Sequence, residues 1–156
     1  MLEIDIPGFG PVKLEHLVSD FTGTLSVDGK LIPRVKETLN KIAEYLKIHI
    51  LTADTFGRAR KELEGVLCEI HIITGKDHDL QKELYVKKLG ADCVVALGNG
   101  INDRKMLKVA KIGIAVCLKE GCARDAYISS DVVTTSAMDA LELLLNTKRL
   151  KATLRF

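Results

Sequence analysis

Short runs of β-branched and aliphatic residues alternate with longer amphipathic stretches along the chain, and this alternation restricts the fold more than any other feature. The pattern is typical of strands joined by crossover helices, which form a parallel sheet with helices on both faces. Strands are predicted at residues 2–6, 12–17 (running on to 20), 48–52, 69–73, 93–97, 112–116 and 131–133. Helices are predicted at about 33–46, 56–63, 80–89 and 103–110, near 123, and at 137–145. We therefore predict a three-layer α/β fold with a mainly parallel central sheet.

Size and charge restrict the domain count and the partners. With 156 residues, residues 1–156 are expected to form one domain, because a second core would be hard to fit. The formal net charge is only +2 and opposite charges are interspersed, which argues against a nucleic-acid surface. The basic segment 148–151, with Arg155, is predicted to be a solvated C-terminal tail.

The chain carries no apolar stretch of roughly 20 residues and has acidic residues near its start, so we expect no membrane and a cytoplasmic location. Four cysteines form no Cys-x-x-Cys pair, which favours free thiols over a zinc site or a disulfide framework. The histidines His16, His49, His71 and His78 share no metal-ligand spacing and are expected to be structural.

Polar residues and glycines follow several of the predicted strands directly. They are Asp20-Phe21-Thr22-Gly23-Thr24, Thr52-Ala53-Asp54, Thr74-Gly75-Lys76 and Gly98-Asn99-Gly100-Ile101-Asn102-Asp103. In a parallel sheet the carboxyl ends of the strands meet at one edge, where ligands bind. We therefore predict that an active site lies at this edge.

The residue types at this edge suit phosphoryl transfer. A carboxylate such as Asp20, followed by a Gly-containing turn with free backbone amides, can attack phosphorus and form an aspartyl phosphate. The reaction needs a cation to offset charge repulsion, for which Mg²⁺ with oxygen ligands such as Asp103 is suitable. It also needs donors for the phosphoryl oxygens, and Thr52 and Lys82 provide a hydroxyl and an ammonium.

Together these segments resemble, in order, the four motifs of the haloacid dehalogenase superfamily. The motifs are residues 18–25, a segment ending in Thr52, residues 82–90 beginning with Lys82, and residues 96–103. The resemblance implies the superfamily's Rossmann-like core without a cap domain. It implies Asp20, Thr22, Thr52 and Lys82 as catalytic residues. It also implies phosphate binding by Thr52, Lys82 and Gly23, and Mg²⁺ binding by Asp20, the Thr22 carbonyl, Asn99 and Asp103. Lys76 is the reserve candidate for the lysine.

Two positions depart from the superfamily's phosphatases. Thr22 replaces their second aspartate, so the first motif resembles the phosphorylation domain of P-type ATPases, and the chain is similar to soluble P-type-ATPase-like phosphatases. Because threonine cannot act as the general acid, which typically contributes a factor of about 10²–10⁴, we expect slow turnover. Asn99 replaces a metal-binding aspartate, so weaker Mg²⁺ binding is expected. Residues 27–31 carry a two-residue hairpin signal that predicts a short flap in place of a cap.

The expected partner is a phosphorylated small molecule or a phosphoprotein, and the resemblance suggests self-association. Two alternatives remain open at this point. A receiver-type signalling domain also combines a strand-end aspartate, a threonine and a lysine, but it needs an acidic pair after its first strand. A catalytically weak superfamily member could serve as an interaction module, and Asn99 is the main argument for it.

Overall fold

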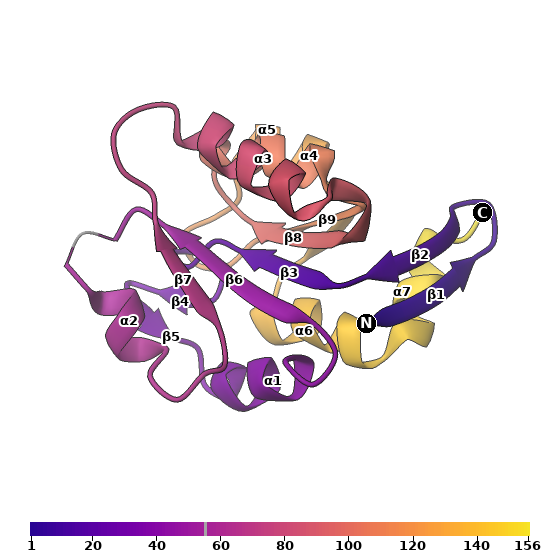
Figure 1. Cartoon of the computed structure of the whole chain (residues 1–156), viewed down its shortest axis with the longest axis horizontal. Coiled ribbons are helices and arrows are strands. Elements are labelled where there is room, and N and C mark those ends of the chain that lie inside the picture. The colour runs from indigo at the N-terminus through magenta and orange to yellow at the C-terminus, as the bar shows by residue number, and fades with distance from the viewer. Residues whose placement is uncertain (55) are drawn as a thin grey trace.

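Six parallel strands form the central sheet of the protein, seen here in a computed structural model that describes residues 1–54 and 56–156 (Figure 1). In order across the sheet they are β10 (Val132–Thr134), β9 (Ile112–Val116), β8 (Val94–Gly98), β3 (His16–Ser19), β6 (Lys47–Thr52) and β7 (Glu69–Ile72). Every neighbouring pair is parallel. The predicted α/β class and parallel sheet are confirmed.

Helices cover both faces of this sheet (Figure 1). On one face lie α3 (His78–Leu89), α4 (Arg104–Val109) and α5 (Arg124–Ser129); on the other lie α1 (Val35–Ile42) and α6 (Ala137–Leu145), and α7 (Thr147–Leu154) packs beside α6. The short helix α2 (Arg58–Glu62) packs Ala59 into the apolar cluster of the α1 face. Two 3-10 turns, η1 (Ala91–Cys93) and η2 (Ile101–Asp103), flank β8. No helix in the described part of the chain is long and apolar enough to cross a membrane.

Two apolar cores lie on opposite faces of the sheet because strand side chains alternate. Leu17 of β3 belongs to the cluster beneath α1 and α6, whereas the next residue, Val18, belongs to the cluster beneath α3 and α4. Strands buried on both faces are continuously apolar, which explains the uninterrupted sequences of β8 and β9.

The first two strands, β1 (Leu2–Ile6) and β2 (Gly10–Leu14), form a hairpin that precedes the sheet, and the expected strand at 12–17 is divided. The division falls at Glu15, whose backbone amide donates to the Cys93 carbonyl at 2.8 Å while its carbonyl accepts from the Lys47 amide at 2.9 Å. The chain thus passes from the hairpin into the sheet at this residue.

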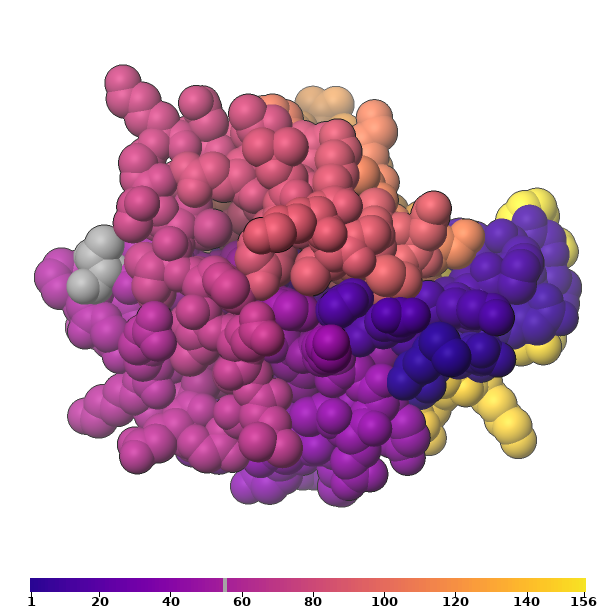
Figure 2. Space-filling model, viewed as in Figure 1, coloured from indigo at the N-terminus to yellow at the C-terminus, as the bar shows by residue number. Residues whose placement is uncertain are grey.

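The basic residues Lys148, Arg149 and Arg155 are exposed, as expected of a solvated segment, but the segment is not a loose tail. Residues of this segment form α7, which packs against β1, and Leu150 is fully buried. The Phe156 amide donates to the Pro7 carbonyl at 3.1 Å, so the C-terminal segment (yellow) and the hairpin (indigo) lie side by side (Figure 2). Leu150 and Leu154, four residues apart, provide the apolar side of this helix.

The flap predicted at residues 27–31 is present as β4 (Ser26–Val27) and β5 (Lys30–Leu31). Its two turn residues, Asp28 and Gly29, have φ angles of 52° and 80°, as a type I′ hairpin requires. The Leu31 amide donates to Glu62 of α2 at 3.1 Å, which fixes the flap against that helix.

Candidate active site

The carboxyl ends of β3, β6 and β8 meet at a cleft of about 850 Å³. β3 is flanked by β6 on one side and β8 on the other, so the chain reverses its direction across the sheet at this point. Such switch points are the usual ligand sites of parallel sheets. The lining includes Asp20, Phe21, Thr22, Asp28, Thr52, Asp54, Arg58, Lys82, Asn99, Gly100 and Glu120.

A buried ammonium joins two carboxylates at the floor of this cleft. Lys82 Nζ lies 3.1 Å from Asp20 Oδ1 and 2.7 Å from Asp103 Oδ1. Lys82 is 1% exposed and Asp103 is 0% exposed, so the ammonium and the Asp103 carboxylate are shielded from water, whereas Asp20, at 8%, borders the cleft. Lys82 is carried by α3, which ends at Gly90, where φ is 95°. The site thus depends on a helix packed across the sheet as well as on the strand ends.

The two carboxylates and the ammonium shift one another's pKa values. Burial and then the Asp103 carboxylate raise the pKa of Asp20 to about 7, against the opposing effects of Lys82 and a Phe21 backbone hydrogen bond. Burial alone would lower the pKa of Lys82, but the Asp20 and Asp103 carboxylates outweigh it and raise this pKa to about 12. Lys82 therefore stays charged, while Asp20 holds a proton more readily than an ordinary aspartate does.

Asp103 was expected to bind metal, but both of its carboxylate oxygens already accept hydrogen bonds from the protein. Its Oδ1 accepts from Lys82, and its Oδ2 accepts from the amides of Asn99 at 3.0 Å and Gly100 at 2.9 Å. It does not line the cleft. This geometry supports a role in holding Lys82 and the loop after β8, and does not support direct contact with a cation in the cleft.

Gly98 is fitted closely to the Asp103 side chain. A Cβ at Gly98 would lie 2.5 Å from Asp103 Cβ and 2.6 Å from its Cγ, whereas one at Gly100 would meet its nearest neighbour at 3.2 Å. We expect Gly98→Ala to lower the free energy of unfolding by about 1–3 kcal/mol, because the buried carboxyl must move. Urea unfolding would measure the loss. Gly100→Ala is the matched control, and an equal effect of both substitutions would contradict the fit described here.

Thr24 and Asn99 lie near Asp20 Oδ2, the carboxylate oxygen that Lys82 does not contact. The Thr24 hydroxyl lies 3.4 Å from Asp20 Oδ2 and 3.2 Å from Asn99 Oδ1. The Asn99 amide nitrogen donates to the Gly121 carbonyl at 3.2 Å, which turns its oxygen toward Thr24. Gly23 has φ 78°, and a Cβ there would lie 2.5 Å from Asn99 Nδ2. The turn after Asp20 therefore requires glycine on both counts.

Thr52 and Thr22 also line the cleft, together with Asp54. Thr52 is buried, and its hydroxyl accepts from the Asp54 amide at 3.3 Å. The Asp54 carboxylate accepts from the Phe56 amide at 3.1 Å and the Ala59 amide at 2.6 Å, so it caps the start of α2. Lys76, the reserve lysine, is exposed and lies outside the cleft lining.

Sequence reasoning did not single out Glu120, Arg58 or Thr24. Glu120 Oε1 accepts from the Asp28 amide at 3.0 Å, so the loop after β9 is joined to the tip of the flap. Thr24 lies inside the first motif and could have been found there. The sequence around Glu120 and Arg58 did not indicate that they line the cleft, because their positions depend on how segments from different parts of the chain pack together.

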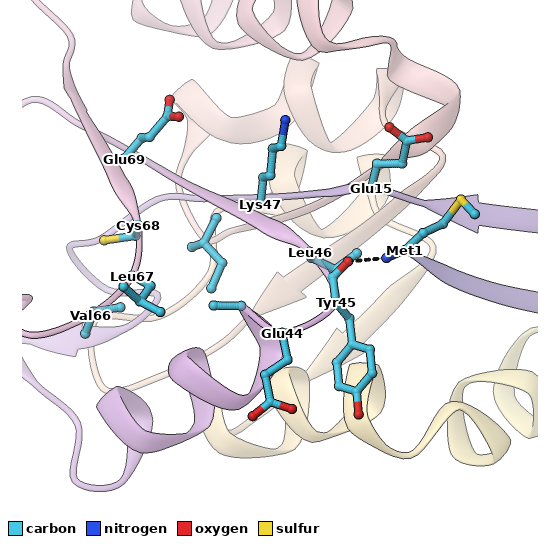
Figure 3. A pocket seen from close by; sticks show the side chains of 12 residues that line it. Met1, Glu15, Glu44, Tyr45, Leu46, Lys47, Val66, Leu67, Cys68 and Glu69 are labelled. Atoms are coloured by element: carbon cyan, nitrogen blue, oxygen red, sulfur yellow. Dashed lines mark hydrogen bonds between the residues drawn. The ribbon is translucent and has the colours of Figure 1, made fainter.

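Another hollow, of about 630 Å³, lies at the amino ends of the strands (Figure 3). Tyr45, Leu46, Leu67 and Cys68 contribute to its lining, and the Met1 amino group donates to the Tyr45 carbonyl. It lies at the end of the sheet away from the strand-end residues, so it is not the ligand site that this topology favours.

The fold is shared with solved phosphatase structures. The 3-deoxy-D-manno-octulosonate 8-phosphate phosphatase of Moraxella catarrhalis, in complex with magnesium, phosphate and KDO, has a TM-score of 0.67 and 22% identity over 91% of this chain and 94% of that one. The cobalt-bound enzyme of Haemophilus influenzae has a TM-score of 0.68 and 12% identity over 92% and 94%. A zinc-transporting PIB-type ATPase has a TM-score of 0.63 and 23% identity over 78% of this chain and 20% of that one.

The fold is thus the Rossmann-like fold of the haloacid dehalogenase superfamily. The chain belongs to one family with the uncharacterised protein MJ0073 of Methanocaldococcus jannaschii, to which it is 47% identical over 77 residues, or 49% of this chain and 77% of that protein. No protein-family model matches the chain.

Proposed function

We propose that the protein is a Mg²⁺-dependent phosphoryl-transfer enzyme that forms an aspartyl phosphate on Asp20. The observation that carries this proposal is the placement of one buried carboxylate at a strand end. Asp20 is held by Lys82 at 3.1 Å on one oxygen and faces the Thr24 hydroxyl with the other. It opens into a cleft with further oxygen donors. A held carboxylate with a neighbouring ammonium is suited to attack a phosphoryl group whose oxygens need positive charge.

The donors on the cleft side of Asp20 fit Mg²⁺. Asp20, Thr22 and Asn99 all line the cleft, and the Asp20 carboxylate, the Asn99 side-chain oxygen and the Thr22 carbonyl would provide hard oxygen ligands of the kind that Mg²⁺ prefers. Asn99 brings no charge, but the Glu120 and Asp28 carboxylates also line the cleft. When bound, the cation offsets the repulsion between a carboxylate nucleophile and a phosphate.

The reaction proceeds in two displacements. A carboxylate oxygen of Asp20 attacks phosphorus as the bond from phosphorus to the ester oxygen breaks, and that oxygen leaves with the bonding electrons. Water then attacks the phosphorus of the acyl phosphate, which releases phosphate and restores the carboxylate. Lys82 and Thr52 hold the phosphoryl oxygens in both steps, and Asp103 keeps Lys82 in place through its bond of 2.7 Å.

The substrate is a phosphorylated small molecule or a phosphoprotein, and we favour the small molecule. The Moraxella catarrhalis neighbour, named as a phosphatase of a sugar phosphate, supports that class. The flap tip, with Asp28 and Gly29, lines the same cleft and is the part of the chain best placed to contact the remainder of the substrate.

Thr22 accounts for the slow turnover that we propose. A Thr22→Asp variant gains a carboxyl at the position of the missing general acid, so we expect hydrolysis of an aryl phosphate to accelerate by about 10²–10⁴. The phosphoenzyme should decay faster in parallel. Steady-state hydrolysis and single-turnover decay would measure both. Thr22→Asn, similar in size but without an acidic proton, should stay at the wild-type rate, and an equal gain in that variant would contradict the assignment.

Trapping of the intermediate tests the proposed function directly. The protein is incubated briefly with a labelled aryl phosphate, with and without Mg²⁺, and quenched in acid. We expect Mg²⁺-dependent label on Asp20 that hydroxylamine removes, as an acyl phosphate requires, together with release of phosphate. A receiver domain would take up label without sustained hydrolysis. An interaction module would show neither, and either result would overturn the proposal.

A further inference from the structure

A second group of polar side chains lies on the α3 face of the sheet, apart from the cleft. It consists of His16 of β3, His49 of β6, Glu69 and His71 of β7, and Tyr85 of α3, around a cavity of about 320 Å³. The strand register brings these residues together. His49 is paired directly with Glu69, and His71, two residues further along β7, points to the same side of the sheet.

Three ligand atoms of this group converge. Glu69 Oε2 lies 3.5 Å from His49 Nδ1 and 3.3 Å from His71 Nε2, and each of the three residues offers one ligand atom within 4.8 Å of those of the other two. Tetrahedral zinc holds imidazole nitrogens and carboxylate oxygens at about 2.0–2.2 Å, which sets its ligand atoms roughly 3.3–3.6 Å apart. The distances of Glu69 Oε2 from the two imidazole nitrogens, 3.5 Å and 3.3 Å, match that spacing.

We propose that His49, Glu69 and His71 form a binding site for a zinc-class transition-metal ion, with the fourth position open to water or a small ligand. Two imidazoles and one carboxylate suit Zn²⁺ better than Mg²⁺, which prefers oxygen ligands throughout. His16 Nδ1 lies 3.0 Å from His49 Nε2, so His16 fixes the ring that presents Nδ1 to the metal. The Glu69 side chain is 66% exposed, which gives the ion a path of entry.

Two features of this cavity disfavour binding of a metal ion: the positive charge of nearby lysines and the hydrogen bonds of Tyr85. Lys47 and Lys88 line the same cavity, but both residues are exposed, so water screens their charge. The Tyr85 hydroxyl lies 2.9 Å from His49 Nδ1 and 2.6 Å from His71 Nε2, and it bridges the two rings. A bound metal replaces these two hydrogen bonds, and the tyrosine side chain must turn aside.

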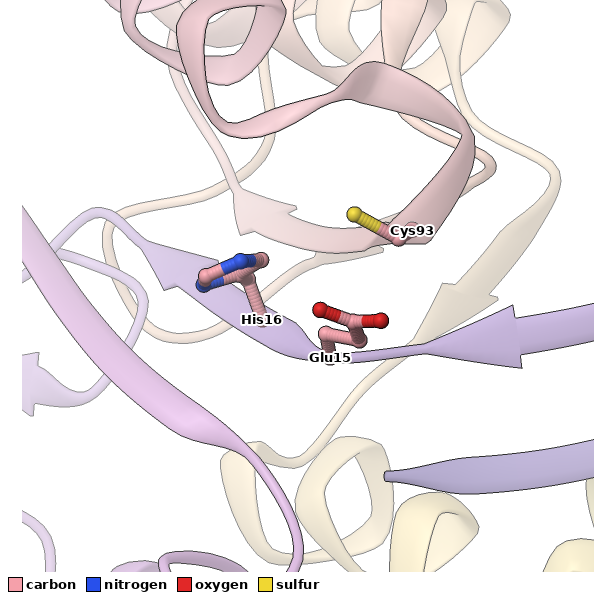
Figure 4. Close-up of side chains that lie close together, drawn as sticks. All are labelled: Glu15, His16 and Cys93. Carbon is pink, nitrogen blue, oxygen red and sulfur yellow. The ribbon is translucent and has the colours of Figure 1, made fainter.

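A neighbouring trio competes for His16. Glu15, His16 and Cys93 also place ligand atoms within 4.8 Å of one another (Figure 4). The Cys93 thiol, however, donates to the Gly90 carbonyl at 3.0 Å, and His16 is already engaged with His49. We therefore assign the metal to the His49 trio, and Cys93→Ser distinguishes the two sites.

The experiment is a zinc titration of the full chain against a chromogenic chelator, with Co²⁺ absorption as a report on coordination geometry. We expect one tight zinc site per chain and a tetrahedral Co²⁺ spectrum, both retained in Asp20→Asn and Cys93→Ser. His71→Ala should weaken zinc binding by at least about 100-fold, and His16→Ala by about 10–100-fold. His78→Ala, a histidine outside the cluster, should bind zinc like the wild type.

Equal binding by His71→Ala and His78→Ala would overturn the assignment, as would loss of the site in Asp20→Asn or Cys93→Ser. Glu69→Gln provides a second ligand variant if His71→Ala does not fold, because the side chain of Glu69 is mostly exposed. Zinc affinity of that variant equal to wild type would also reject the site. The experiment measures metal binding alone, so its result does not depend on whether the protein catalyses phosphoryl transfer.

Discussion

Asp20→Asn is expected to abolish phosphoenzyme formation and to lower Mg²⁺-dependent phosphate ester hydrolysis by at least about 10³-fold. The amide that replaces the carboxylate is not a nucleophile, and both steps of the proposed reaction require the Asp20 carboxylate. The measurement combines acid-quench labelling with steady-state hydrolysis at saturating Mg²⁺. Residual labelling at another residue would show that the nucleophile is misassigned.

Loss of activity in Asp20→Asn should not reflect unfolding. The pKa of Asp20 is raised to about 7 in the folded protein, mainly by burial. A raised carboxyl pKa means that the stability contribution of this group is present below its unfolded pKa and lost as pH rises through the folded value. At pH 8 the neutral amide therefore relieves a cost, and we expect a melting temperature equal to or above that of the wild type. A large drop in that temperature would contradict this balance.

Lys82→Met is expected to lower the free energy of unfolding by about 3–5 kcal/mol, since it leaves two carboxylates in a buried site without their cation. Asp20 and Asp103 both bond the same ammonium, at 3.1 Å and 2.7 Å. Urea unfolding at pH 8 would measure the loss. Lys76→Met, which removes an exposed ammonium outside the cleft, is the matched control and should change stability little.

A double variant separates charge from packing in this effect. In Lys82→Met with Asp103→Asn, one of the two unpaired carboxylates is also removed, so part of the lost stability should return. If the double variant is as unstable as the sum of the two single variants, the loss comes from packing around the lysine stem, and the ion network is not its cause.

The strand-end residues could be predicted because two local signals coincide. Asp20 and Thr52 each follow a short branched run directly, and parallel topology brings such ends together without any knowledge of side-chain contacts. Gly23 and Asn99 follow in the same way from their motifs. The flap at residues 27–31 could also be predicted from a local signal. Asp-Gly favours the positive φ angles of a two-residue hairpin turn, and Asp28 and Gly29 adopt them.

Features that depend on packing between distant segments could not be predicted. The sequence does not show that both oxygens of Asp103 are occupied by Lys82 and backbone amides, because that requires the position of α3 over η2. That His16, His49 and His71 lie together was not predicted from the sequence, because they are on three different strands and their spacing along the chain carries no signal. Helix α7 was missed because a single fully buried residue, Leu150, anchors an otherwise basic segment.

The central place of β3 in the sheet has a consequence for folding. β3 pairs with β6 in the first half of the chain and with β8 in the second, and the Asp20 amide itself donates to the Leu97 carbonyl at 3.0 Å. Pairings between segments so far apart in sequence carry a large loop-closure entropy, so we expect the chain to fold more slowly than a helical protein of the same size. Asp20, the proposed nucleophile, therefore has its final surroundings only once β3 has paired with both β6 and β8. Partly folded chains can therefore contain Asp20 without a competent catalytic centre.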